Sequence, residues 1–198
     1  MHNWLRTVAF FLLFFFVSIN TYAHDKASDF SMLSGMLHPL SGFDHFLAMF
    51  SVGLISSIMG NRNLWLVPMA FVLAMVLGGI IGANAISVPF TETGIAISLI
   101  ALGLAIMLLK KGMKTLPVFC FVFLFGLYHG NAHGIEIPNA AAPFFYTTGF
   151  LITTIFIHVI GLFVGELIVD RKYTAGILKI VGSIILFSGI FFFSKSIF

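Results

Sequence analysis

The sequence predicts an all-α membrane protein, a bundle of six transmembrane helices that follows a cleavable signal peptide. Three observations support this fold class. Of the 198 residues, 60% are hydrophobic and only 9% are charged, whereas a soluble domain carries about a quarter charged residues. Six apolar stretches follow the N-terminal segment, and most approach the length that crosses about 30 Å of hydrocarbon. Basic residues concentrate in alternate loops between these stretches, as in multi-pass membrane proteins.

The N-terminal segment has the three parts of a secretory signal peptide. A basic start precedes the apolar run 7–19, and residues 20–23 end on a small residue at the expected cleavage point. The apolar run is shorter than the roughly 20 residues that a spanning helix needs. We therefore expect residues 1–23 to be removed and residues 24–198 to form one six-span membrane domain. The alternative is an uncleaved anchor helix.

The six later stretches are predicted to be helices. A chain in lipid must satisfy its own backbone hydrogen bonds, and these stretches do not alternate apolar with polar residues as barrel strands do. Glycines four residues apart, Gly78 with Gly82 and Gly161 with Gly165, allow neighbouring helices to approach closely. The predicted spans are 39–59, 64–83, 94–109, 116–128, 144–169 and 175–193.

Loop charges predict which side of the membrane each end of the bundle faces. If the mature N-terminus is outside the cytoplasm, the cytoplasmic loops hold six basic residues and the outer segments hold two, Lys26 and Lys195. The chain is accordingly predicted to lie in the bacterial inner membrane with its N-terminus outside. The six cytoplasmic residues are Arg62, Lys110, Lys111, Lys114, Arg171 and Lys172.

Composition excludes several classes of function. The net charge of +3 is small and scattered, which argues against nucleic-acid binding. Cys120 is the single cysteine, so the chain has neither an internal disulfide nor a thiolate cluster for metal. The sequence contains no phosphate-binding loop of the form G-x-x-x-x-G-K-[ST]. Any transport must therefore draw its energy from a partner ATPase, a coupled ion or the membrane potential.

A first ionisable cluster lies at the start of the first predicted span. His38 precedes Pro39, a residue that suits the first turn of a helix, and Asp44 and His45 follow within the span. His38 and His45 are seven residues apart, so a regular helix would place them on one face. Asp44 and His45 would lie within about 10 Å of the outer end of that helix. Ionisable residues inside a span are costly and are usually functional.

A second cluster closes the fourth span and, on the predicted topology, also emerges on the outer side. His129, His133 and Glu136 follow an i, i+4, i+7 pattern that shares one face of a continued helix. Gly130, Gly134 and Pro138 instead favour a break in the helix at this point. In both cases two sequence-distant groups of imidazole and carboxylate meet at one membrane face, a pattern that favours first-row metal ligation.

His158 lies near the middle of the fifth span, with Gly161 and Gly165 on almost the same face. The histidine is therefore expected to point into the bundle. Taken alone, such a residue more often donates an interhelical hydrogen bond, but together with the two clusters it suits a path across the membrane. Imidazole and carboxylate without thiolate favour Ni²⁺, Co²⁺ or Zn²⁺ over Cu⁺, Mg²⁺ or Ca²⁺.

The motifs H-P-x-x-G-x-D-H and H-G-x-A-H-G-x-E-x-P, with the signal peptide and the span count, resemble the HupE/UreJ family over essentially the whole chain. That family comprises small bacterial membrane proteins regarded as nickel permeases and associated with hydrogenase and urease gene clusters. Asn131 stands where some relatives are expected to carry a further histidine. By this resemblance the metal-ligating residues are His38, Asp44, His45, His129, His133 and Glu136.

The resulting hypothesis is a permease, not an enzyme, that imports Ni²⁺ or Co²⁺ for the maturation of a metalloenzyme such as hydrogenase or urease. Its expected partners are the metal ion and the lipid bilayer, with no prosthetic group. Metal would be captured at the outer clusters, pass His158 and be released inside. The alternative is a membrane-embedded metal-dependent hydrolase whose catalytic metal is held by the same groups. His158 favours the permease because it lies too deep for an outer-face active site.

Overall fold

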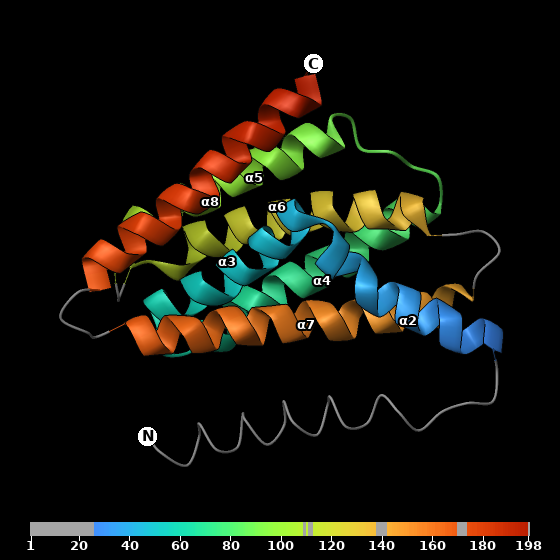
Figure 1. Ribbon diagram of the computed structural model, residues 1–198, viewed down its shortest axis with the longest axis horizontal. Helices are drawn as coiled ribbons and strands as arrows, with labels where there is room; N and C mark the ends of the chain where they lie inside the picture. Colours follow the sequence, from blue (N-terminus) through green and yellow to red (C-terminus); the bar gives the residue numbers. More distant parts are fainter. Residues whose placement is uncertain (1–25, 109, 111–112, 138–141, 170–173, 198) are drawn as a thin grey trace, which may run out of the picture.

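The computed structural model describes residues 26–108, 110, 113–137, 142–169 and 174–197. The predicted signal peptide lies outside these residues, and its removal stays a prediction. The described chain is all-helical, which confirms the predicted class (Figure 1). Its helices are α2 (Lys26–Ser41), α3 (Phe43–Met59), α4 (Asn63–Ala83), α5 (Thr91–Leu108), α6 (Thr115–Glu136), α7 (Pro143–Ile168) and α8 (Thr174–Ile197).

Five of the described helices, α4 to α8, are each long and apolar enough to cross a membrane. The pair Ser31–Ser41 and Phe43–Met59 passes the same test as one span that is bent by 80°. Counting the bent pair as one, the described residues hold the six predicted spans. The first of them, however, is a broken helix.

The predicted regular helix over 39–59 is wrong at its start. Gly42 separates α2 from α3 in an extended conformation, with φ −87° and ψ 103°. Pro39 lies inside the last turn of α2, not in the first turn of a helix, and its missing N–H weakens the helix at that point. Asp44 lies in the first turn of α3, where a negative charge favours a helix start. His38 and Asp44 therefore belong to two different helices.

The predicted break in the helix at Gly130 and Gly134 is also wrong, because α6 continues without interruption to Glu136. Both glycines face the backbone of α4. A Cβ on Gly130 would collide with the carbonyl oxygen of Met75, and a Cβ on Gly134 would collide with that of Gly79. These glycines therefore permit close helix packing and do not form a turn.

Close helix pairs build the bundle: α4 packs on α6, α5 on α8, and α7 on both α3 and α2 (Figure 1). The predicted glycine contacts are confirmed. Gly78 and Gly82 lie against the backbone of α6, while Gly161 and Gly165 lie against α3. As a result, α6 belongs to one tightly packed pair and α3 to another.

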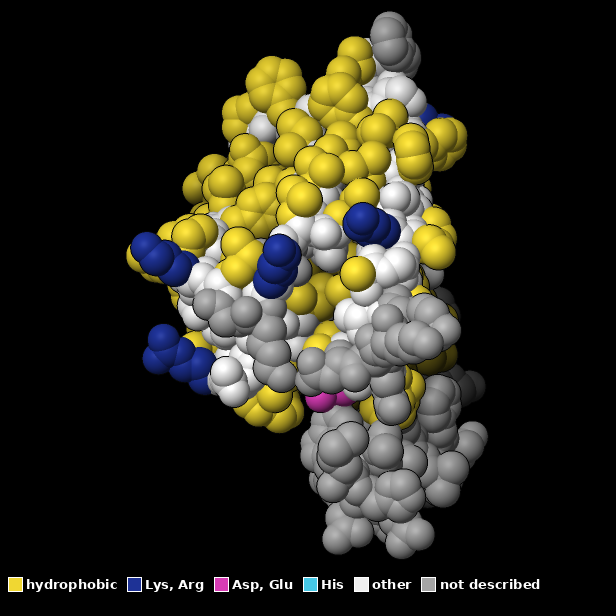
Figure 2. Space-filling model, turned by 90° about the vertical axis from the view of Figure 1, so that its left-hand side faces the viewer, with side chains coloured by type: hydrophobic (Ala, Val, Ile, Leu, Met, Phe, Trp, Pro, Cys, Tyr) yellow, Lys and Arg dark blue, Asp and Glu magenta, His cyan; other side chains and the backbone are white. Residues whose placement is uncertain are grey.

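Basic side chains mark one end of the bundle. At one end the C-terminal ends of α3, α5 and α7 lie near the starts of α4, α6 and α8 (Figure 1). Basic side chains gather on that face, and no histidine is seen there (Figure 2). The loop charges predict this end to be cytoplasmic. The opposite end, where α6 ends and α7 begins, is called the predicted outer end below.

Candidate functional site

Five histidines, contributed by four helices, lie along a series of ring contacts that leads from the predicted outer end into the bundle. The ring centroids of His38 and His133 lie 4.8 Å apart, and those of His133 and His45 lie 4.4 Å apart. The His45 ring is in turn 5.2 Å from the ring of His129. The broken α2–α3 span and the continuous α6 thus bring the two sequence-predicted clusters together. The histidine line, as we call it, consists of His38 (α2), His133 (α6), His45 (α3), His129 (α6) and His158 (α7).

The outermost histidines form a triad with a carboxylate. His38 Nε2 lies 2.9 Å from His133 Nδ1 and 3.2 Å from Glu136 Oε2. Glu136 Oε2 lies 3.5 Å from His133 Nδ1. One ligand atom from each residue falls within 4.8 Å of the others, which is close enough to share a metal ion. Glu136 is half exposed and His133 is buried, so this outer triad connects the surface with the interior.

His45 and His129, here called the inner pair, are each oriented through Nδ1. His45 Nδ1 lies 2.9 Å from Asp44 Oδ1, which also accepts the backbone N–H of His45 at 2.9 Å. His129 Nδ1 lies 2.8 Å from the carbonyl oxygen of Phe125 and donates to it. A neutral ring that donates from Nδ1 keeps its lone pair on Nε2. Asp44 therefore lies against His45 and orients its ring, and it is not among the three residues of the outer triad.

Unpaired ring nitrogens mark the histidine line. Among the described residues, the Nε2 atoms of His45, His129, His133 and His158 are buried and have no hydrogen-bond partner. His158 repeats the orientation of His129, since its Nδ1 lies 2.7 Å from the carbonyl oxygen of Thr154. Each buried unpaired polar group costs about 1–3 kcal/mol. Four such atoms in one group call for a functional explanation, and a ligand that binds them would offset the cost.

Phe71 of α4 connects the inner pair to His158. Its ring centroid lies 5.4 Å from that of His129 and 5.3 Å from that of His158, and its side chain is fully buried. The face of an aromatic ring attracts cations, so this contact does not exclude a metal ion from the route. Phe71 has no distinguishing signal in the sequence, because it is one of 25 phenylalanines and lies in an ordinary apolar span.

Asn131 holds the connection between α4 and α5. Its Oδ1 accepts the backbone N–H of Val88 at 2.9 Å, and its Nδ2 donates to the carbonyl oxygen of Ile86 at 2.8 Å. Both polar groups of the buried amide are therefore used for structure. Where a histidine would add a potential ligand, this chain has a residue that ties the α4–α5 connection to α6.

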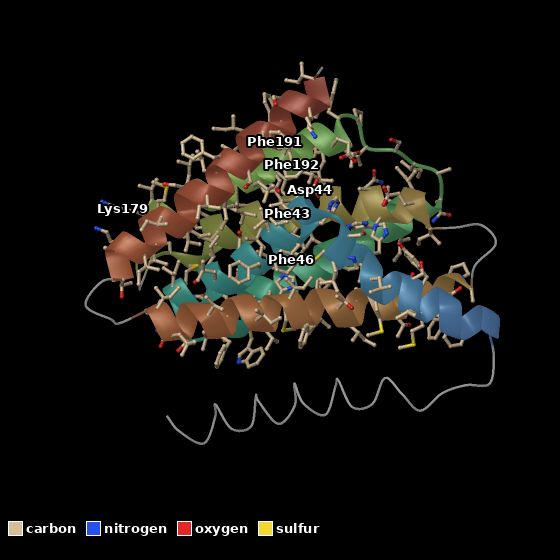
Figure 3. The ribbon with its side chains drawn as sticks, viewed as in Figure 1. Phe43, Asp44, Phe46, Lys179, Phe191 and Phe192 are labelled. Atoms are coloured by element: carbon tan, nitrogen blue, oxygen red, sulfur yellow. The ribbon has the colours of Figure 1, made fainter. Side chains whose placement is uncertain are left out.

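Apolar cavities border the histidine line between α4 and α7. His133 lines a cavity of about 310 Å³, and His158 lines another of about 230 Å³. A larger groove of about 730 Å³ lies along α8 and includes Phe43 and Lys179 (Figure 3). No histidine or carboxylate lines this groove, and it is not part of the candidate site.

Comparisons with known proteins agree with the motifs. The family model described as "HupE / UreJ protein" matches residues 12–192. A curated relative, "Protein HupE" from Rhizobium leguminosarum bv. viciae, is 39% identical over 141 residues, which cover 71% of this chain and 73% of the relative. No solved structure matches the chain.

Proposed function

The chain belongs to the HupE/UreJ family, and from this membership together with the histidine line we propose that it is a permease importing a divalent transition metal, most readily Ni²⁺. The family is associated with nickel or cobalt accessory transport for hydrogenases and ureases. The observation that carries the proposal is the set of four buried Nε2 atoms without partners. Ligands distributed along a route serve transport, whereas a single catalytic metal needs them at one point.

The ligand chemistry supports a first-row dication. The outer triad offers two imidazoles and one carboxylate, a set that suits Ni²⁺, Co²⁺ and Zn²⁺ better than Mg²⁺ or Ca²⁺. The single cysteine, Cys120, is exposed, so no thiolate cluster favours Cu⁺. The preference for nickel over cobalt and zinc rests on the family association, because these ions differ little in their affinity for one site.

In this proposal the ion loses part of its water shell at the outer triad and moves inward past the inner pair and Phe71 to His158. An inward-negative membrane potential of 100 mV supplies about 4.6 kcal/mol to a dication that crosses fully. Release into the cytoplasm, where a metalloenzyme consumes the metal, completes import. The inner-membrane location and the outer position of the mature N-terminus are part of the same proposal.

The alternative function, a metal-dependent hydrolase, has less support. Such an enzyme needs one metal with an open coordination position and room for a substrate beside it. The outer triad satisfies the first requirement. However, His129 is fully buried and His158 is only 2% exposed, and hydrolysis at the outer face gives neither residue a role.

Uptake by vesicles that contain only the purified protein tests the proposal. We expect Ni²⁺ to accumulate when an inward-negative potential is imposed, and Mg²⁺ to remain outside. Protein-free vesicles and vesicles without a potential are the controls. Failure to move Ni²⁺, Co²⁺ or Zn²⁺ above the protein-free level, in protein that is folded by its helix content, would contradict the permease function.

A further inference from the structure

We propose that His133 transfers the metal between two separate binding stations through its two ring nitrogens. The outer station is the outer triad, and the inner station consists of the inner pair with His133 again. This inference rests on the proposed function. It divides into two stations the residues that the sequence motifs group as one site.

The outer station uses the Nδ1 side of the His133 ring. Nδ1 lies 2.9 Å from His38 Nε2 and 3.5 Å from Glu136 Oε2. These distances leave all three ligand atoms directed at one small region at the predicted outer end. A metal held there has two imidazoles and a carboxylate as protein ligands, and Glu136, being half exposed, keeps the station open to water.

The opposite side of the same ring belongs to the inner station. His133 Nε2 is buried and has no partner among the described residues, although Nδ1 of the same ring is well contacted. The His45 ring centroid is 4.4 Å away, and the Nδ1 of His45 is engaged by Asp44. His129 lies next to His45 and also keeps its Nε2 free. Three neighbouring rings thus each have an uncommitted Nε2.

The ligand atoms of the inner station lie farther apart than those of the outer station. The metal-ligand spacing of 4.8 Å is met by His38, His133 and Glu136, and the three inner rings do not form a second such group among the described residues. The rings come from different helix pairs, since His45 is on α3, which packs on α7, and His129 is on α6, which packs on α4. A small shift between these pairs would close the station on an arriving ion.

The chemistry of imidazole makes the two stations exclusive. A neutral ring carries one proton, so metal on Nδ1 leaves that proton on Nε2, and metal on Nε2 leaves it on Nδ1. His133 therefore serves one station at a time, and the inward step exchanges one proton. Nε2 releases its proton to the remaining water shell of the ion as it binds the metal, and Nδ1 takes up one proton from water beside the half-exposed Glu136. We expect one Ni²⁺ per chain, which is held first by the outer triad and then by the inner station.

Two substitutions of His133 test the roles of its two ring nitrogens one at a time, because each keeps a polar atom at the position of only one of them. The side-chain amide of asparagine reaches about as far as Nδ1, and that of glutamine reaches about as far as Nε2. His133→Asn should keep Ni²⁺ binding at the outer station and reduce uptake by more than tenfold. His133→Gln should weaken Ni²⁺ binding about tenfold or more. Calorimetry on the purified protein measures binding, vesicle uptake measures transport, and helix content with thermal unfolding shows that each variant is folded.

A third variant, at another residue, keeps the inference testable if both substitutions of His133 disturb folding. X-ray absorption of His129→Ala should show the same nickel ligands as the unsubstituted protein, two imidazoles and a carboxylate, while uptake is lost. If His129→Ala instead removes an imidazole from the bound metal, the residues form one site and the two-station inference is wrong. The inference is equally contradicted if the Asn and Gln variants behave alike. Failure of the unsubstituted protein to bind or transport Ni²⁺ contradicts the proposed function itself.

Discussion

The two regions that supply the histidine line present their ligands in opposite ways. α6 carries His129, His133 and Glu136 on one continuous helix, which its glycines hold against α4. α2 and α3 carry His38 and His45 on the two sides of a break that is bent by 80°. The continuous helix sets its ligands one turn apart, whereas the break lets two rings from one span contact the same partner. We call α6 the continuous side and the α2–α3 span the broken side. Glycine contacts hold both sides closely, since α2 and α3 pack against α7 in the same way.

Gly130→Val tests the continuous side and has the largest expected effect. A Cβ at this position would collide with the backbone carbonyl oxygen of Met75, which cannot rotate away. Over-packing of this kind costs about 1–3 kcal/mol or more, so we expect low yield and a lower unfolding temperature in detergent. Gly176→Val is the matched control, because a Cβ there would meet nothing within 4 Å. Equal stability of the two variants would mean that α6 is not held by close contact with α4.

Asp44→Asn tests how the broken side orients its ligand. The carboxylate accepts both the ring N–H and the backbone N–H of His45. Asparagine keeps an accepting oxygen but removes the negative charge beside the ring, and substitution of such a partner weakens metal affinity or activity about 10–100-fold. Ni²⁺ uptake measured over a range of concentrations should show this as a higher half-saturating concentration. Glu166→Gln is the control, since Glu166 accepts from Ser57 elsewhere in the bundle. Unchanged affinity in the Asp44→Asn variant would show that Asp44 has no role in metal binding.

Gly42→Ala perturbs the break itself and should have the smallest effect of these three. The extended conformation of Gly42 is available to alanine. The new Cβ would, however, lie 3.0 Å from His45 Nδ1 and 3.3 Å from Asp44 Oδ1, so the ring must shift slightly. We expect a few-fold loss of apparent affinity in the same uptake assay.

Gly79→Ala is the control for Gly42→Ala, because its Cβ would make an ordinary 3.6 Å contact. If Gly42→Ala affects affinity no more than Gly79→Ala does, the tight geometry at the break is not needed for binding.

The sequence predicts the spans and the two ligand clusters well because hydropathy and loop charge are strong signals over many residues. The positions at which helices break are predicted less well. Pro39 and Gly42 stand in one motif, and Gly130 and Gly134 stand in the other. From its local sequence, each motif is compatible with either a break or a start of a helix. Gly130 and Gly134 are also four residues apart, the spacing that predicts close helix packing at Gly78 and Gly82. A single sequence does not distinguish close packing from a break, and the contact of Gly130 with α4 shows that close packing is correct.

The candidate site shows the same limit at the level of atoms. The sequence motifs single out His158 and six residues expected to be ligands, and the structure brings the two clusters together. One of the six, Asp44, instead contacts His45 Nδ1 and orients that ring. Which ring nitrogen faces which neighbour depends on hydrogen bonds to Asp44 and to the carbonyl oxygens of Phe125 and Thr154. Phe71, in an apolar span, becomes visible only through its contacts with two histidine rings.

His158→Ala, with binding and uptake measured on one preparation, tests most directly whether the histidine line is the route of the metal. His158 is 2% exposed and contacts Phe71, on the far side from the outer triad. We expect Ni²⁺ affinity in calorimetry to match that of the unsubstituted protein, while uptake into vesicles falls to the protein-free level. Uptake at the unsubstituted rate, in a variant that binds and folds normally, would contradict a route through His158 and return the residue to a purely structural role.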